Sequence, residues 1–159
     1  ELAKLVNEYR VSLGLKELTI SKSLTKVARI HTIDTEKNKP YEELDTRGIK
    51  GNLHSWSGNG PWKKVIYTSD HKYSSGMWNK PSELTNYKGS GFEISVISSG
   101  TITPLGALKA WQGSEGHNNV IIGKDSWSDL TTMGIGIENG VSHVWFGKRP
   151  DPDGYFYIK

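Results

Sequence analysis

The sequence contains no cysteine among its 159 residues. This absence excludes disulfide bonds, thiolate zinc sites and cysteine nucleophiles, so any metal site must use histidine, aspartate or glutamate. No apolar run approaches the roughly 20 residues that a membrane-spanning helix needs. The opening residues ELAKLVNEYR lack the basic and apolar regions of a signal peptide, a pattern that does not decide between a secreted and a cytosolic protein.

The sequence also lacks any cluster of charge of one sign. It has 20 Lys and Arg and 17 Asp and Glu, a net charge of +3, and these residues are scattered along the chain. We therefore expect no nucleic-acid partner, because such proteins gather basic residues on one face. Hydrophobic residues make up 35% of the chain, and we find no repeat or linker. We expect a soluble globular protein with a single domain over residues 1–159.

Two helices are predicted at the start of the chain. Residues 2–13 carry apolar side chains at helical spacing, and Gly14 follows as a stop. A second helix is capped by Ser21 or Ser23. It ends near Asn38, because the residue that precedes Pro40 disfavours helix.

The middle of the chain, residues 40–103, mixes short apolar pieces with Gly, Ser, Asn and Pro, and indicates mostly loops. KVIYTS (64–69) and EISVIS (93–98) are candidate strands. Thr103 and Pro104 then resemble a helix start, with Thr as the cap and Pro at the first helical position. That helix ends at Gly113 and Gly116.

The last third predicts a β-hairpin. MGIGI (133–137) alternates apolar residues with glycine, Asn139-Gly140 is a strong two-residue turn signal, and VSHVWFG (141–147) returns. Helices followed by an antiparallel sheet indicate an α+β fold.

Five histidines are candidates for chemistry, and three have ordinary interpretations. His31 lies in the second helix, where a hydrogen bond to Asp34 is favoured over a ligand role. His143 lies in the return strand, where packing is favoured. His71 lies in a polar turn, where an exposed side chain is the default.

His54 and His117 differ from the other three. Each lies in a glycine-rich break, in GNLHSWSGNG (51–60) and in WQGSEGHNNVI (111–121), where no apolar stripe explains an imidazole. A paired role in one site is one interpretation. Two unrelated loop histidines are the alternative.

Several stretches, in order, resemble the CAP superfamily of cysteine-rich secretory, antigen 5 and pathogenesis-related proteins. LVNEYRVSLGLKELTISKSLTKVARIHTIDTEKN resembles its opening two helices, and HSWS (54–57) its His-Ser element. GFEIS (91–95) occupies the place of its Gly-Glu-Asn stretch. AWQGSEGHNNVI resembles the bacterial-type SCP form of its Trp-x-x-Ser-x-x-His signature, and MGIGIENGVSHVWFG its closing hairpin. The resemblance covers nearly the whole chain.

The resemblance implies a three-layer α-β-α sandwich with a central antiparallel sheet and a large cleft. Many members place two histidines and two acidic residues in that cleft, where they can hold a divalent metal, often zinc. Residue by residue, the histidines correspond to His54 and His117 and the first acidic residue to Glu93.

The second acidic position departs from the animal and plant pattern, because it falls on Ser114, as in many bacterial members. A serine hydroxyl is a poor zinc ligand. Glu115 is adjacent, but one step along a helix redirects a side chain by about 100°. His54, His117 and Glu93 would then be three protein ligands with water in the fourth place, the composition of an open zinc site.

Three functions compete at this stage. The first is a secreted or cell-surface binding module, with Zn²⁺ or another divalent cation or none, whose cleft holds a lipid, peptide or glycan. The second is a metal-dependent protease or esterase that uses His54, Glu93 and His117. The third is an interaction protein with a vestigial site. We favour the non-catalytic module, as a monomer or weak dimer, and its location follows from the resemblance alone.

Two further features have competing interpretations. Trp56, Trp62, Trp78 and Tyr87 could form an aromatic cleft wall or pack in the core. DPDG (151–154) has two alternating aspartates before a glycine but lacks the other ligands of a calcium loop, so a turn is favoured.

Overall fold

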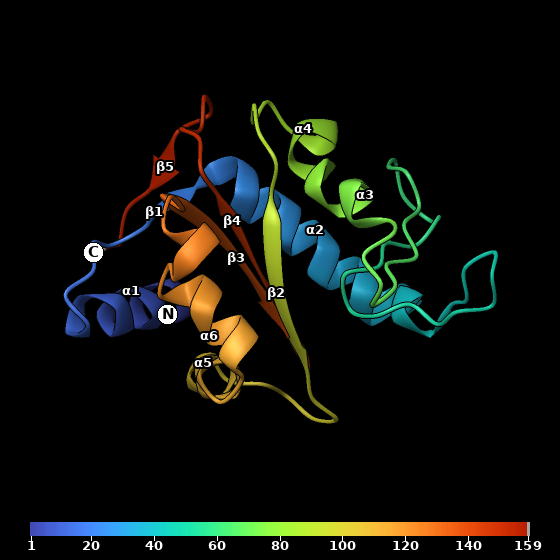
Figure 1. Cartoon of the computed structure of the whole chain (residues 1–159), viewed down its shortest axis with the longest axis horizontal. Helices are drawn as coiled ribbons and strands as arrows, with labels where there is room; N and C mark the ends of the chain where they lie inside the picture. Colours follow the sequence, from blue (N-terminus) through green and yellow to red (C-terminus); the bar gives the residue numbers. More distant parts are fainter. Residues whose placement is uncertain (159) are drawn as a thin grey trace.

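The structure is a computed structural model that describes residues 1–158. Helices flank a twisted sheet at the centre of the molecule (Figure 1). The helices are α1 (Leu2–Ser12), α2 (Lys22–Asn38), α3 (Ser74–Trp78), α4 (Lys80–Leu84), α5 (Pro104–Gln112) and α6 (Glu115–Ile121), with 3-10 turns at Pro40–Glu42 and Asp125–Trp127. The strands are β1 (Thr19–Ser21), β2 (Phe92–Ile97), β3 (Thr132–Glu138), β4 (Val141–Gly147) and β5 (Tyr155–Phe156). The predicted α+β class is confirmed.

The sheet has the strand order β2-β4-β3-β1-β5. The hairpin of β3 and β4 turns at Asn139-Gly140 as predicted, and Asn139 takes the positive φ of 50° that such a turn requires. β1 pairs with β3 in parallel, whereas the other pairings are antiparallel. The expected antiparallel sheet is thus confirmed for β2, β4 and β3 at its centre, and β1 adds one short parallel pairing beside the hairpin.

The predicted starts of two helices are confirmed by their caps. Ser21 accepts a hydrogen bond from the backbone N–H of Leu24 at the start of α2, and Thr103 accepts one from Gly106 at the start of α5. A carboxylate also reaches the start of α2 from the far end of the chain: Asp151 accepts hydrogen bonds from the Ser21 hydroxyl and the Ser23 N–H. The DPDG stretch is thus a turn whose first aspartate caps a helix.

One face of the sheet packs against α1, α5 and α6 through an apolar core. Ile94, Val144 and Phe146 point from the sheet into this core, and Trp111 of α5 meets them. All four side chains are fully buried or nearly so. The alternating apolar positions of the strands and the apolar stripes of the helices therefore meet at this face.

The opposite face packs against α2 and the segment that carries α3 and α4. α2 approaches this face closely because β3 has glycine at Gly134 and Gly136. A Cβ atom on Gly134 would lie 2.1 Å from the backbone of Leu24, and one on Gly136 would lie 2.4 Å from the Ala28 carbonyl oxygen. The glycine alternation in MGIGI thus makes room for a helix backbone.

The middle of the chain is mostly loops, as predicted, with one strand expectation confirmed and one wrong. EISVIS corresponds to β2, but KVIYTS contributes only one isolated bridge, between Val65 and Trp56. Within residues 1–158, no strand of the sheet pairs with KVIYTS to extend this bridge. Trp56 and Tyr87 are completely buried, which supports core packing for these two aromatics, whereas Trp78 is 39% exposed.

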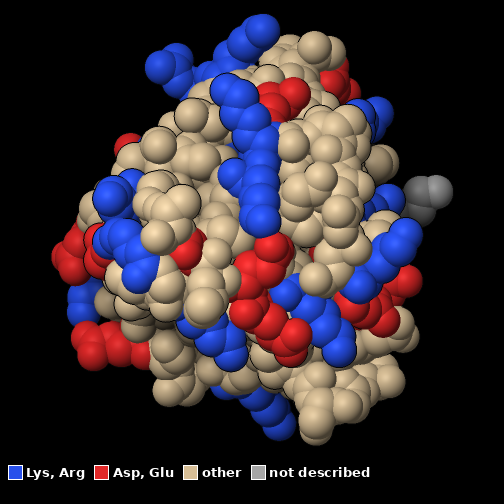
Figure 2. Space-filling view, turned by 90° about the vertical axis from the view of Figure 1, so that its right-hand side faces the viewer, with Lys and Arg blue, Asp and Glu red and all other residues tan. Residues whose placement is uncertain are grey.

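Charged side chains of both signs lie next to one another on the face built by these loops, and neither sign covers it (Figure 2). Arg47 is typical: it forms ion pairs with both Asp45 and Asp70. Among residues 1–158, no helix is both long and apolar enough to cross a membrane.

Candidate functional site

The three residues expected to form the site come from three separate elements. His54 lies in a turn that comes after α2 in the sequence. The side chain of Asn52 fixes the backbone of this turn by accepting a hydrogen bond from the His54 N–H. Glu93 is the second residue of β2 and points to the α2 side of the sheet. His117 lies within α6, so the expectation that it projects from a loop is wrong. A new helix starts at Glu115, because the chain resumes helical structure after Gly113 at the end of α5 and the N-cap residue Ser114.

Glu93 and His54 are in direct contact. Oε1 of Glu93 lies 2.7 Å from Nδ1 of His54, and the Glu93 side chain is completely buried while that of His54 is 21% exposed. Burial alone would raise the pKa of Glu93. The imidazoles of His143 and His31, and the hydrogen bonds from His31 and His54, outweigh burial and hold this pKa below its usual value. Glu93 is therefore a carboxylate at neutral pH.

His117 is half-buried and electrostatically coupled to His54. Burial lowers the pKa of His117, and the nearby His54 lowers it further, so His117 is a neutral imidazole at pH 7. Among the described residues, neither ring nitrogen of His117 makes a hydrogen bond, nor does Nε2 of His54. Both side chains thus retain an unused nitrogen lone pair.

The two candidates for the second acidic position lie beside α6. Ser114 is its N-cap residue, although its side chain makes no capping hydrogen bond, and Glu115 is its first helical residue. Glu115 is exposed, and no ion pair or hydrogen bond joins it to His54 or His117 within residues 1–158. Among residues 1–158, the Ser114 side chain likewise makes no hydrogen bond to either imidazole.

His31, interpreted from the sequence as a partner of Asp34, is instead a central residue of the site. Its Nδ1 lies 2.5 Å from Oε2 of Glu93, and its Nε2 lies 2.8 Å from the carbonyl oxygen of Ser55. Asp34 accepts hydrogen bonds from Ser57 and Asn38 instead. The sequence could not reveal this pairing, because Glu93 is 62 residues away from His31.

His143, which we expected to pack in the core, is buried but also bonded at both ring nitrogens. Nδ1 lies 2.7 Å from the Ser95 hydroxyl and 3.2 Å from Oε2 of Glu93, and Nε2 lies 2.8 Å from the Thr35 hydroxyl. Burial lowers the pKa of His143 well below its usual value, so the ring is neutral. Nδ1 then carries the proton that faces the carboxylate, and Nε2 accepts from Thr35.

Aromatic stacking fixes the rings of this buried group. The His31 ring lies between the indole of Trp56, at 4.1 Å and 2°, and the imidazole of His143, at 3.9 Å and 18°. The ligand atoms of His31, Glu93 and His143 all lie within 4.8 Å of one another, so this group could hold a metal ion. As described, however, the contacts at 2.5 Å and 3.2 Å to Oε2 of Glu93 are hydrogen-bond distances.

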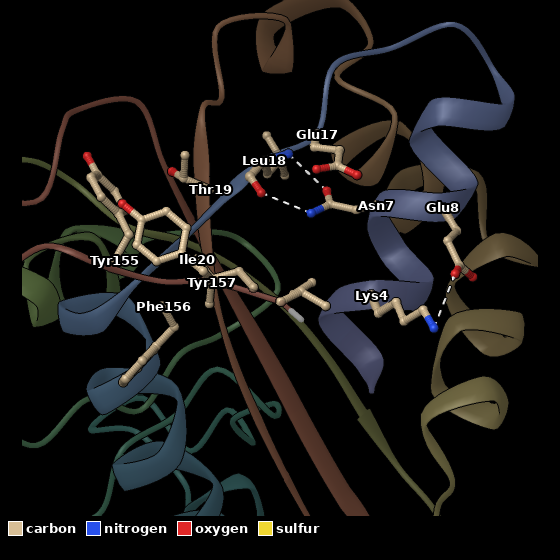
Figure 3. Close-up of a pocket in the computed structure, with 11 residues that line it drawn as sticks. Lys4, Asn7, Glu8, Glu17, Leu18, Thr19, Ile20, Tyr155, Phe156 and Tyr157 are labelled. Atoms are coloured by element: carbon tan, nitrogen blue, oxygen red, sulfur yellow. Dashed lines mark hydrogen bonds and ion pairs between the residues drawn. The ribbon is translucent and has the colours of Figure 1, made fainter.

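The pocket in Figure 3 lies elsewhere, between α1, β1 with the residues just before it, and β5 with the residues just after it. It has a volume of about 540 Å³, and Asn7 on its wall is bonded to the backbone of Leu18. It includes none of His54, Glu93 and His117. The large cleft implied by the resemblance stays a prediction. The candidate site is identified by the chemistry of its side chains and not by a pocket.

The two outer imidazoles, those of His54 and His117, offer nitrogen atoms of the kind that divalent metals of the zinc class bind. Neutral imidazole nitrogen is a preferred ligand of such ions, and metal-bound histidines usually donate their other ring N–H to a carboxylate. His54 already makes that bond to Glu93. Glu93 itself fits less well as a ligand, because its two oxygens are engaged by His54 and His31 and its side chain is not exposed.

The model of the cysteine-rich secretory protein (CAP) family matches residues 3–146. The chain belongs to this family. No curated protein matches the sequence.

Three solved structures share the fold. An outer surface protein from Borrelia burgdorferi is 21% identical, with a TM-score of 0.59, over 94% of this chain and 90% of that one. An extracellular protein containing an SCP domain from Bacillus anthracis is 17% identical, with a TM-score of 0.60, over 93% of this chain and 39% of that one. A cysteine-rich secretory protein from Staphylococcus aureus is 17% identical, with a TM-score of 0.57, over 93% and 37%. This chain therefore corresponds to only part of the last two proteins.

Proposed function

We propose that this domain is a non-catalytic binding module in which His54 and His117 hold a divalent metal. The observation that carries the proposal is the contact of Glu93 with Nδ1 of His54 at 2.7 Å, which leaves Nε2 of that ring as the free ligand atom. Neutral His117 supplies the second nitrogen. In this arrangement Glu93 orients His54 and is not itself a metal ligand.

The ligand set favours Zn²⁺ or a similar borderline metal. Imidazole nitrogens suit zinc, copper and nickel, whereas calcium and magnesium prefer oxygen ligands. Two protein nitrogens leave at least two of the four positions of a tetrahedral ion for water or for an outside ligand. When bound, the metal would supply a Lewis acid that accepts oxygen or nitrogen donors from that ligand.

Binding is favoured over hydrolysis by the state of Glu93. A hydrolase needs a carboxylate or another base that can reach a metal-bound water. The Glu93 carboxylate is buried and engaged at both oxygens, and Ser114 at the second acidic position carries no charge. The catalytic roles expected for His54, Glu93 and His117 therefore lack a free base.

The same geometry favours a peptide or glycan ligand over a lipid. Peptides and glycans carry the oxygen donors that would complete the coordination of a metal held by two imidazoles. The lipid alternative depended on an aromatic groove, but Trp56 and Tyr87 are enclosed in the core. A glycan or a peptide carboxylate is thus the ligand class that we propose.

We propose further that the domain acts outside the cell or at its surface, as a monomer or weak dimer. The proposal about location is supported by the family, and by two structural neighbours described as an outer surface protein and an extracellular protein.

The buried group of His31, Glu93 and His143 is a second place where a metal could bind. We favour the outer pair for a physical reason. Ligands of one tetrahedral zinc ion at about 2.0–2.1 Å lie roughly 3.3 Å apart, so an ion in the buried group would have to break the 2.5 Å contact of His31 with Glu93. Nε2 of His54 and both ring nitrogens of His117 make no hydrogen bond among the described residues, so a metal bound there would break none.

Zinc titration of metal-free protein by calorimetry tests the proposal. We expect saturable binding of one equivalent that His54→Ala and His117→Ala each abolish. His71→Asn is the matched control, because His71 is exposed and Asn tolerates its positive φ of 63°. Binding that survives both alanine variants but disappears in His143→Asn would assign the metal to the buried group, and no binding in the unmodified domain would refute a metal site.

A further inference from the structure

The segment that carries His54 is held from behind by α2. Nε2 of His31 contacts the carbonyl of Ser55, the residue directly after His54. The ring of His31 stacks on Trp56, the next residue along. One turn further along α2, Asp34 accepts the backbone N–H and the hydroxyl of Ser57. Side chains of α2 therefore contact three consecutive residues after His54.

His31 also acts on the ring of His54 through Glu93. The carboxylate bridges the two histidines, with Oε2 at 2.5 Å from Nδ1 of His31 and Oε1 at 2.7 Å from Nδ1 of His54. All of these atoms on His31 and Glu93 are buried. The position of the carboxylate between the two rings consequently depends on His31.

Counting hydrogen-bond donors assigns the protons in this chain of contacts. A carbonyl oxygen only accepts, so Nε2 of His31 carries a hydrogen toward Ser55. The contact of His31 with Glu93 at 2.5 Å occupies Oε2 of the carboxylate. Oε1 then remains as an acceptor, so Nδ1 of His54 donates to it and Nε2 of His54 has its lone pair free. The partner of one ring nitrogen thus sets the role of the other.

We propose that His31 is a positioning residue that fixes both the backbone and the ring tautomer of His54 and thereby raises the affinity of the site for a divalent metal. The inference rests on the proposed function of His54. It adds to that function a residue of the helix that makes no contact with the metal. Outer partners of this kind typically change metal affinity by about 10- to 100-fold when they are removed.

The variant His31→Phe tests the proposal, because phenylalanine keeps a flat ring between Trp56 and His143 but donates no hydrogen bond. Thr32→Val is the matched control: Thr32 is the next residue of α2, is equally buried, and bonds only to the Ala28 carbonyl. Two quantities are measured in each protein. The ¹⁵N chemical shifts of the His54 ring report its tautomer in the metal-free state, and calorimetry reports the affinity for Zn²⁺.

We expect unmodified protein and Thr32→Val to show a His54 ring protonated at Nδ1, with equal zinc affinity. In His31→Phe we expect this tautomer to lose its dominance and the affinity to fall by about 10- to 100-fold. A variant that loses stability but keeps the tautomer and the affinity of the control would show that His31 has a structural role alone, and would overturn the proposal.

The two readouts separate this proposal from the proposed function. If unmodified protein binds no zinc, the metal site fails, yet the tautomer of His54 in metal-free protein still decides whether His31 positions the ring. If His31→Phe does not fold, His31→Gln replaces it, since its amide keeps one of the two donors. A smaller change of tautomer in that variant supports the proposal, and an unchanged tautomer contradicts it.

Discussion

The two faces of the central sheet differ in the side chains that they bury. Ile94 and Glu93 are neighbours on β2, and both are almost completely buried. Ile94 points into an apolar core, whereas Glu93 points into a layer where a hydrogen-bonded polar group lies among apolar side chains such as Trp56 and Trp145. The comparison teaches that polar groups can be buried on the α2 side because hydrogen bonds compensate for the loss of water.

The polar face also differs in how closely its helix approaches. On the apolar side, bulky side chains such as Trp111 and Phe146 separate the helices from the strands. On the polar side, the glycines of β3 bring the α2 backbone against the sheet, which lets His31 reach Glu93. The site can form because Gly134 and Gly136 have no side chains, so that α2 lies close enough to the sheet for these contacts.

Replacement of one residue on each face would give the largest contrast. Glu93→Leu removes the carboxylate that contacts His31, His54 and His143, and we expect a loss of about 3–5 kcal/mol in the free energy of unfolding. Ile94→Val on the apolar face should cost only about 0.5–1.5 kcal/mol. Urea denaturation followed by circular dichroism measures both. Equal losses would show that the polar layer is no more specific than the apolar core.

The close approach of α2 gives the second prediction. Gly134→Ala places a Cβ atom 2.1 Å from the Leu24 backbone, and we expect a destabilisation at the upper end of about 1–3 kcal/mol. Gly116→Ala is the control, because a Cβ atom there meets no atom within 4 Å and alanine favours the helix. Thermal unfolding compares the two variants. A Gly134→Ala protein as stable as the Gly116→Ala protein would mean that α2 can shift away freely.

A dependence on pH gives the smallest effect. The folded-state pKa of His143 lies well below its unfolded value of about 6.5, so as pH falls through that value the unfolded chain takes up a proton that the folded domain does not. Stability should therefore fall from pH 7 to pH 5, by up to about 1 kcal/mol per pH unit from this residue.

His143→Asn isolates this contribution, because asparagine does not titrate. The unfolding free energy of the variant should change less over the same range than that of the unmodified domain. Parallel curves for the two proteins would show that His143 is not held neutral in the folded state.

The sequence predicted those parts of the fold that depend on local or periodic signals. The spacing of apolar residues and the caps at Ser21 and Thr103 gave the helices, and Asn139-Gly140 gave the hairpin. KVIYTS was a wrong strand prediction, because strand-forming residues need a neighbouring strand to pair with, and only Trp56 bridges to it.

The site was predicted in part, for a related reason. The resemblance led to His54, Glu93 and His117, but His31 and His143 were interpreted from their own elements, where neighbours in sequence suggest ordinary packing. Their actual partners come from distant elements, Glu93 and Ser95 on β2 above all. One signal was available: His143 and the glycines of MGIGI alternate on adjacent strands, a pattern that indicates a face where a helix comes close.

The carboxylate of Asp151 at the start of α2 has a consequence for biosynthesis. A ribosome completes α2 more than a hundred residues before it adds Asp151. Until then, the helix that carries His31 lacks one of its capping groups, and β1 lacks both neighbouring strands. We therefore expect the part of the fold that holds His31 to reach its final stability only late in translation.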